Sequence, residues 1–181
     1  MDWFTSDTHF SQVRTLELSK RPFNGVQEMD KIIIKNWNSK VSQHDTVYHA
    51  GDFGDYNKVK ELNGNIILIC GNYEEKDLKT KFNNDFNLFN KYLKELGFKQ
   101  VFLKEIFYSN NSMKNIKICH EPLNCDMNKF NLFGHVHGLC KIKTFGLNIG
   151  IDSHHFYPIN INDVLFYKNA IENYYDDNVF C

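Results

Sequence analysis

Residues 66–72 read Ile-Ile-Leu-Ile-Cys-Gly-Asn, an apolar run that ends abruptly in a glycine and an asparagine. A short apolar run bounded by turn residues predicts a strand that is buried on both faces. Such a strand delivers Asn72 to its carboxyl end, which is where α/β folds place their ligand sites. This segment therefore predicts a buried sheet with a polar side chain at its edge.

The same arrangement recurs along the chain. Five short motifs, each at the end of an apolar run, follow in the order Asp7-Thr8-His9, Gly51-Asp52, Gly71-Asn72, His120 and Gly134-His135-Val136-His137. Carboxylate, amide and imidazole side chains are suitable ligands for divalent cations. Two metals held about 3.5–4 Å apart by such ligands clamp the attacking and leaving oxygens of a phosphate ester in line. The motifs in this order therefore predict a phosphoesterase.

Strands and helices are expected to alternate between these motifs. Apolar residues at helical spacing predict a helix over 26–40. The expected strands are 2–6, 45–49, 66–70, 130–133 and 145–151, with a hairpin of 100–108 and 115–119 around Asn110-Asn111-Ser112. The other expected helices are 56–62, 75–96 with a break near Asn83-Asn84, and one from Asn160 or Asn162 to Tyr174. Early alternation and later consecutive strands predict an α/β (α+β) fold, with two packed sheets and helices outside.

Composition narrows the class of protein. The 181 residues contain no linker or repeat, so we expect a single domain over 1–181. The formal net charge is −1, so no overall positive field attracts nucleic acid, and extended nucleic-acid binding is not expected. The five cysteines include no Cys-x-x-Cys pair, and Cys70 and Cys119 are expected to be buried thiols. With no signal peptide or membrane-spanning run expected, we predict a cytoplasmic protein without a membrane partner.

Each motif taken alone also has a structural interpretation. Asp7 and His9 share one face of a strand, but a turn uses the same residue types. Asp52 follows a glycine that allows a sharp turn, although an aspartate here could equally cap a helix. Asn72 could be a plain turn residue, and a single His120 at a strand end is more often structural than metal-bound. The combination of all five motifs in order favours the metal site.

The most specific motif is Gly134-His135-Val136-His137-Gly138, in which two histidines lie two apart between glycines. With the other four motifs it resembles the calcineurin-like metallophosphoesterases, and in particular a small subgroup common in bacteria and bacteriophages. That subgroup is similar to this chain also at 5–10, 21–23, 36–38, 45–49 and 148–152, so the resemblance spans most of residues 4–165. It implies a pair of mixed β-sheets packed as a sandwich between helices. A phage-encoded relative would act in the host cytoplasm.

The resemblance also implies residue roles. Asp7, His9, Asp52 and His137 would hold one metal, and Asp52, Asn72, His120 and His135 the other, with Asp52 bridging. The metals implied are two divalent ions, manganese first, with iron, zinc or nickel as alternatives, and mixed oxygen and nitrogen ligands do not choose among them. Charge then predicts the mechanism, in which a bridging water becomes hydroxide near neutral pH and attacks phosphorus in line.

Tyr73 departs from the family pattern. Many members carry histidine after the metal-binding asparagine, where it resembles a general acid for the leaving group. A phenol, with a pKa of about 10, is a weaker acid but can still donate a proton. We therefore group Tyr73 with Asp52, Asn72 and His120 as candidate catalytic residues. The departure leaves the substrate open and favours diesters with good leaving groups.

Four further residues are candidate substrate contacts. Arg21 could reach a phosphate or simply stiffen a loop before proline. His49 could orient a ligand from behind or be a core histidine, and His154 and His155 could lie at the mouth of the site or be exposed.

These observations favour a phosphodiesterase acting on a nucleotide or another small phosphoester. The alternatives are a phosphomonoesterase or protein phosphatase of the same fold, a non-catalytic scaffold and a nuclease for long duplexes. Intact ligand positions count against the scaffold, and the absence of a basic stripe counts against the nuclease. The natural substrate and the oligomeric state stay open.

Overall fold

A computed structural model describes residues 1–110 and 114–176, and it contains two five-stranded sheets. The first sheet has the order β10 (Ile159–Asn160), β1 (Asp2–Thr5), β2 (Thr46–His49), β3 (Asn65–Ile69) and β4 (Gln100–Phe102). The second has the order β5 (Ile106–Tyr108), β6 (Ile116–Ile118), β7 (Asn131–Phe133), β9 (Gly146–Asn148) and β8 (Ile142–Lys143). Strands β1 to β4 are parallel, as are β6, β7 and β9, so each sheet brings several carboxyl ends to one edge.

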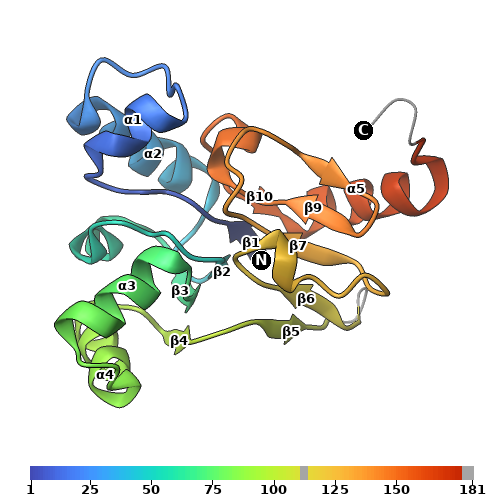
Figure 1. Ribbon diagram of the computed structural model, residues 1–181. Helices are drawn as coiled ribbons and strands as arrows, with labels where there is room; N and C mark the ends of the chain where they lie inside the picture. Colours follow the sequence, from blue (N-terminus) through green and yellow to red (C-terminus); the bar gives the residue numbers. More distant parts are fainter. Residues whose placement is uncertain (111–113, 177–181) are drawn as a thin grey trace.

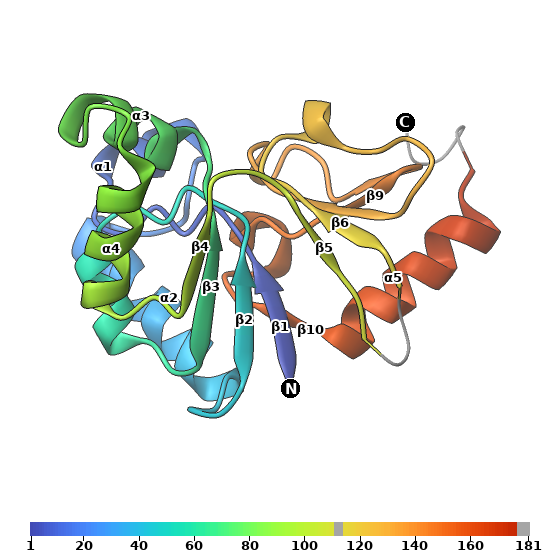
Figure 2. The ribbon, with the colours of Figure 1, turned by 90° about the horizontal axis from the view of Figure 1, so that it is seen from below.

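Helices cover the sheets on the outside (Figures 1 and 2). They are α1 (Val13–Leu18), α2 (Val26–Lys40), α3 (Asn72–Lys81), α4 (Phe86–Leu96) and α5 (Ile161–Tyr174), with 3₁₀ turns at Tyr56–Glu61, Pro122–Asn124 and Ile151–His154. Helices α1 to α4 lie on the side of the first sheet, whereas α5 packs against β1, β9 and β10. The described helices include none that is long and apolar enough to cross a membrane.

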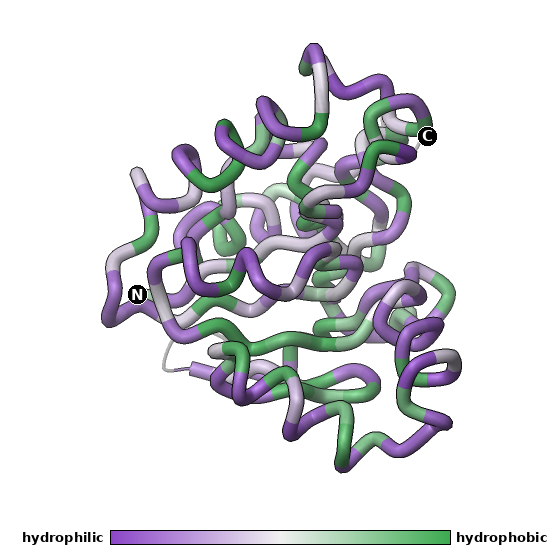
Figure 3. The backbone as a smooth tube through the Cα atoms, turned by 90° about the vertical axis from the view of Figure 1, so that its left-hand side faces the viewer, coloured by the Kyte–Doolittle hydropathy of each residue, from purple (hydrophilic) through white to green (hydrophobic). Residues whose placement is uncertain are grey.

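Two hydrophobic clusters follow from the alternation of side chains along the strands. Trp3 on β1 and Leu68 on β3 point into the cluster beneath the helices. Their neighbours Phe4 and Ile69 point into the cluster shared with the second sheet and α5. Figure 3 shows the resulting pattern, with hydrophobic stretches along the interior strands and alternating hydropathy on the outer helices. The first sheet is therefore buried on both faces, as its apolar strands predict.

The fold prediction is confirmed in its architecture: a mixed α/β fold with two mixed sheets and outer helices. The break expected near Asn83-Asn84 separates α3 from α4, and both residues have left-handed φ angles of 50° and 62°. Asn160 is the residue that caps α5, because its side chain accepts hydrogen bonds from the backbone N–H groups of Asn162 and Asp163.

The expected hairpin is only half right. Ile106–Tyr108 does pair antiparallel with Ile116–Ile118, but Gln100–Phe102 is a strand of the first sheet. The chain passes from one sheet to the other between these two strands, and periodicity alone does not reveal the change of sheet. Of the expected turn at residues 110–112, Asn111 and Ser112 lie outside the described residues. Three short elements, α1, β8 and β10, were not predicted from the sequence.

Candidate metal centre

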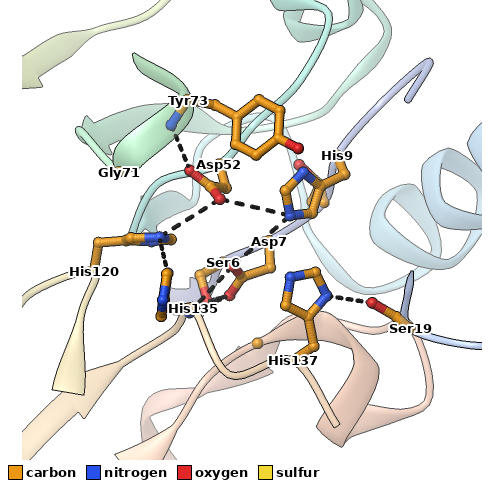
Figure 4. Close-up of polar contacts among 12 residues, drawn as sticks. Ser6, Asp7, His9, Ser19, Asp52, Gly71, Tyr73, His120, His135 and His137 are labelled. Atoms are coloured by element: carbon orange, nitrogen blue, oxygen red, sulfur yellow. Dashed lines mark hydrogen bonds and ion pairs between the residues drawn. The ribbon is translucent and has the colours of Figure 1, made fainter. Parts of the chain in front are cut away.

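The seven predicted ligand side chains come together where the carboxyl ends of strands from both sheets meet. Asp7, Asp52 and Asn72 follow β1, β2 and β3 of the first sheet, with His9 two residues after Asp7. His120, His135 and His137 follow β6 and β7 of the second sheet. The site is therefore built across the junction of the two sheets, and neither sheet carries it alone (Figure 4).

Asp52 lies at the middle of the site. Its Oδ2 atom is 3.6 Å from Nε2 of His9 and 3.5 Å from Nε2 of His120. Its Oδ1 atom accepts a hydrogen bond of 3.0 Å from the backbone N–H of Tyr73, which fixes the orientation of the carboxylate. One carboxylate oxygen thus faces an imidazole from each half of the site (Figure 4).

Three potential metal-ligand atoms lie close together on the side of the site nearer the second sheet. Nε2 of His120 is 2.6 Å from Oδ1 of Asn72, and Nδ1 of His135 is 3.2 Å from both of these atoms. The other nitrogen of His120, Nδ1, lies 2.8 Å from the carbonyl oxygen of Ala50 and donates to it, so Nε2 turns a lone pair toward the cluster. Lone pairs gathered in this way suit a cation at their centre.

The contacts of His9 provide an independent observation that fits a metal site. Its Nδ1 lies 2.7 Å from Oε1 of Gln12, a contact that places the ring proton on Nδ1. Its buried Nε2 atom has no hydrogen-bond partner among the described residues and faces Asp7 and Asp52 at 4.0 and 3.6 Å. A buried imidazole lone pair facing two carboxylates is unfavourable unless a cation lies between them. The residues present therefore fit divalent metal ions.

His137 completes this side of the site. Its ring stacks on that of His9 with centroids 4.9 Å apart, and its Nδ1 lies 2.6 Å from Oγ of Ser19 and 3.5 Å from Oδ2 of Asp152. Ligand atoms of Asp7, His9 and His137 lie within 4.8 Å of one another, and so do those of Asp7, Asp52 and His120. Asp7 is common to both groups, whereas the family resemblance makes Asp52 the shared ligand.

The backbone is held in an unusual conformation at these positions. Asp7, His9, Asp52, His135 and His137 have φ angles of 56°, 50°, 56°, 71° and 49°. Non-glycine residues seldom adopt the left-handed region, and such residues persist only where the surrounding structure determines them. Tight turns at the strand ends thus aim these five side chains at one point.

Gly134 permits a close approach between the two sheets. A Cβ atom at this position would lie 2.3 Å from Oγ of Ser6 and 2.5 Å from Oδ2 of Asp7. The following backbone N–H, that of His135, donates to both carboxylate oxygens of Asp7 at 3.1 and 3.0 Å. Glycine is therefore required here, because any side chain would push Asp7 out of the site.

The Glu74 side chain holds two of the ligand-bearing turns together, a role that was not predicted from the sequence. Its fully buried carboxylate accepts backbone hydrogen bonds from Asp52 and Phe53 at 2.8 and 3.0 Å and from Gly71 at 2.8 Å. It thereby ties the Gly51-Asp52 turn to the Gly71-Asn72 turn. A glutamate at the third position of a helix that begins at Asn72 is the available signal, because such residues often bond back to the helix start.

Arg21 is buried and connects Asp152 to the backbone of the Asp7-Thr8-His9 turn. Its guanidinium donates to both oxygens of Asp152, at 2.8 and 2.7 Å, and to the carbonyl oxygens of Thr8 at 2.9 Å and Asp7 at 2.6 Å. Burial raises the pKa of Asp152, but hydrogen bonds from His137 and Arg21 outweigh burial and bring that pKa to about 2. Asp152, which the sequence analysis did not single out, thus links Arg21 to His137.

The remaining predicted histidines lie away from the convergence point. His49 on β2 is fully buried and its Nε2 lies 3.0 Å from Oγ1 of Thr8, where it holds the Asp7-Thr8-His9 turn from behind. His154 is buried and its Nε2 donates to the carbonyl oxygen of Asn148 at 2.7 Å. His155 is exposed and ends the 3₁₀ turn with a left-handed φ of 55°.

Buried His154 makes the protein sensitive to acid. Burial lowers its pKa to about 4, with the Asn148 hydrogen bond acting in the opposite direction. Because the folded pKa lies below the unfolded one, the contribution of His154 to stability is complete above about pH 6.5 and is lost as pH falls toward 4. We expect His154→Gln, which cannot ionise, to remove roughly 2 kcal/mol of the stability lost between pH 7 and pH 5. Urea unfolding at the two pH values measures this, and equal pH dependence in both proteins would contradict it.

Asp52 is the titrating group at the centre. Burial raises its pKa to about 7, with the charges of Glu74 and Asp7 adding to this effect and His120 opposing it. Burial lowers the pKa of His120, but Asp7 and Asp52 raise it above its ordinary value. Without metal the site thus retains protons, which an incoming cation would displace.

A cavity of about 500 Å³ opens on the centre from the side of α1. Asp52, Asn72, His9 and Tyr73 are among the residues that line it. The Tyr73 ring meets the His9 ring edge-on with centroids 5.0 Å apart (Figure 4). The cavity has the size of a small-molecule site, and the cluster of perturbed carboxylates and imidazoles borders it.

Comparison with known proteins gives two partial sequence relatives. The chain is 41% identical over 81 residues to the uncharacterized protein MJ1445 of Methanocaldococcus jannaschii, a match covering 40% of this chain and 46% of the archaeal protein. It is 31% identical over 81 residues to the gene 66 protein of Mycobacterium phage L5, a match covering 40% of this chain and 39% of the phage protein. Each match thus spans less than half of the relative.

A solved structure shares the whole fold. The protein of unknown function AQ665 from Aquifex aeolicus superposes with a TM-score of 0.67 at 20% identity, covering 92% of this chain and 98% of that one. The family model for the calcineurin-like phosphoesterase superfamily domain matches residues 3–149, which include every ligand position described above. That family comprises metal-dependent phosphoesterases. The chain belongs to the calcineurin-like phosphoesterase superfamily.

Proposed function

We propose that this protein is a dinuclear phosphodiesterase that cleaves a small phosphodiester, such as one formed by a nucleotide. The observation that carries the proposal is the position of Asp52 Oδ2, 3.6 Å from the imidazole of His9 and 3.5 Å from that of His120. A carboxylate oxygen between two sets of ligands suits a bridge between two cations. A site for a single metal ion would not need the second set of candidate ligands.

The two ligand sets follow from this position. Asp7, His9 and His137 would hold one ion and Asn72, His120 and His135 the other, with Asp52 shared. When bound, two divalent cations supply the positive charge that activates water and neutralises the phosphoryl oxygens. The donors are of mixed oxygen and nitrogen type, so manganese is the ion to load first, with iron, zinc and nickel as comparisons.

The chain's own residues prepare the site for this chemistry. Gln12 and Ala50 each accept a ring proton, from His9 and His120, and so leave the opposite nitrogen of each ring free to bind metal. Glu74 and Arg21 hold the turns that carry the ligands, so little reorganisation is needed when the site is loaded. The adjoining cavity of about 500 Å³ has room for a small phosphoester.

Hydrolysis of bis-p-nitrophenyl phosphate is the direct test. Protein freed of metal by chelation should be inactive and should regain activity on addition of manganese, with a second equivalent of metal needed for full activity. Activity that is complete after one equivalent would contradict the dinuclear site. A folded, metal-loaded protein that hydrolyses no phosphodiester would overturn the proposal.

Tyr73 is expected to limit the choice of leaving group. The ring lines the cavity beside His9, where a proton donor to the leaving oxygen would stand. We expect Tyr73→His to raise hydrolysis of esters with poor leaving groups, by about tenfold or more, because imidazolium is the stronger acid. Esters with good leaving groups need no proton and should change little. Tyr73→Phe is the matched control, and equal gains on both kinds of ester would argue against a role in proton transfer.

A further inference from the structure

We propose that Arg14 and Lys20 form a subsite for a second phosphate of the substrate, beside the metal centre. The inference rests on the proposed function, and it narrows the substrate to a nucleotide diester that carries an additional phosphate. Both residues line the cavity of about 500 Å³ that opens on Asp52 and Asn72. Both side chains are exposed, and neither takes part in an ion pair within residues 1–110 and 114–176.

The charge around the centre selects this cavity for an anion. Among the described residues that line it, Asp52 is the one acidic side chain, and Asp52 belongs to the metal site. A second cavity, of about 400 Å³, adjoins Asn72 and His120 on the opposite side. Its lining includes Lys104 and Lys117 but also three glutamates, and Lys117 is already paired with Glu105 at 3.4 Å. A second phosphate is therefore repelled from that side and attracted to Arg14 and Lys20.

Arg14 and Lys20 lie on a segment that contacts candidate metal ligands at both of its ends. Before α1, Gln12 contacts His9 at 2.7 Å, and after it Ser19 contacts His137 at 2.6 Å. Lys20 is followed by Arg21, whose guanidinium donates to the carbonyl oxygen of Asp7 at 2.6 Å. These contacts fix the position of the segment that carries Arg14 and Lys20 relative to the metal site. Recognition of a second phosphate requires such a fixed distance.

Apolar side chains also line this cavity. Leu18 and Leu139 line the same cavity and are 62% and 91% exposed. Together with Val136 they offer a surface for the sugar and base of a nucleotide. An ester consisting of phosphates alone would leave these side chains without a contact.

Binding of two product-like probes tests the subsite without any need for turnover. Thymidine 3′,5′-bisphosphate and thymidine 5′-phosphate differ only in the second phosphate, and their affinities for the manganese-loaded protein can be compared by calorimetry. We expect the bisphosphate to bind at least about tenfold more tightly, the factor that one charge-assisted hydrogen bond supplies. In the Arg14→Gln/Lys20→Gln variant the two affinities should become nearly equal.

Lys31→Gln/Lys35→Gln is the matched control, because it removes the same charge from two exposed lysines of α2 outside this cavity. It should keep the preference for the bisphosphate. No preference in the wild type, or the same preference after the change at Arg14 and Lys20, would overturn the inference. A preference for the bisphosphate without hydrolysis of any diester would support the subsite and reject the proposed function. Hydrolysis of a diester without a preference for the bisphosphate would support the proposed function and reject the subsite.

Discussion

Asp52→Asn should reduce hydrolysis of bis-p-nitrophenyl phosphate by more than about 100-fold, since loss of residues that merely orient metal ligands already costs about 10–100-fold. The variant keeps the size of the side chain and an oxygen but removes the negative charge that would join two cations. Metal titration should show a weaker second equivalent, because Asp52 faces both ligand sets. Retention of wild-type activity would contradict the bridging role.

The pH dependence of unfolding of the same variant, Asp52→Asn, shows whether it is correctly folded. The folded pKa of Asp52, about 7, lies above its unfolded value, so the contribution of this one group to the stability of the metal-free wild type is fully present below about pH 4 and is lost as pH rises through 7. The amide introduced by Asp52→Asn cannot ionise, so the variant should escape that loss. Urea midpoints in the presence of a chelator should therefore fall less with rising pH in the variant. A variant that is inactive and also less stable than the wild type at pH 8 would point to misfolding.

Arg21→Met should destabilise the protein by about 3–5 kcal/mol, the range for breaking a buried ion pair from one side. The Arg21 side chain is fully buried, and its removal leaves the Asp152 carboxylate without its cation at 2.7 Å. It also leaves the carbonyl oxygens of Asp7 and Thr8 without their donors. Chemical unfolding of the metal-free proteins measures the loss.

Two further variants separate charge from geometry. Arg21→Met/Asp152→Asn should recover part of the stability, because the unpaired charge is gone. Arg21→Lys should be intermediate, since an ammonium group keeps the charge but cannot make the forked contact with Asp152 and both carbonyl groups. If Arg21 instead served to contact substrate, Arg21→Lys would be as stable as the wild type and would raise only KM.

Strands β1, β2 and β3 of the first sheet could be predicted because their apolar runs are short and end at polar residues. The run before Asn72 and the alternation along β1 leave little choice of structure. The passage from β4 to β5 could not be predicted, because residues 100–108 have the pattern of one strand although they serve two sheets. The α1 helix has six residues and is held by Gln12 and Ser19 through contacts that its own sequence does not contain.

The candidate ligands were easier to find than the residues that support them. The candidate ligands follow strand ends, and Asp52, Asn72, His135 and His137 are also next to a glycine, so local sequence marks them. Arg21 and Asp152 are 131 positions apart, and no local pattern connects them. A loop arginine before proline gives no sign that its donors are already used inside the protein. The same holds for His49, whose burial depends on Trp37 and Phe53 packing around it.

The candidate ligands are divided between two sheets, and this division affects how long the protein is expected to survive in its folded state. Asp7, Asp52 and Asn72 extend from the first sheet, and His120, His135 and His137 extend from the second. An ion bound by both sets resists separation of the sheets, and its binding energy adds to the energy of folding. When metal is scarce the two halves should part more often and expose their shared apolar surface to proteases. Metal supply should therefore govern the rate at which this protein is degraded, as well as the fraction that is active.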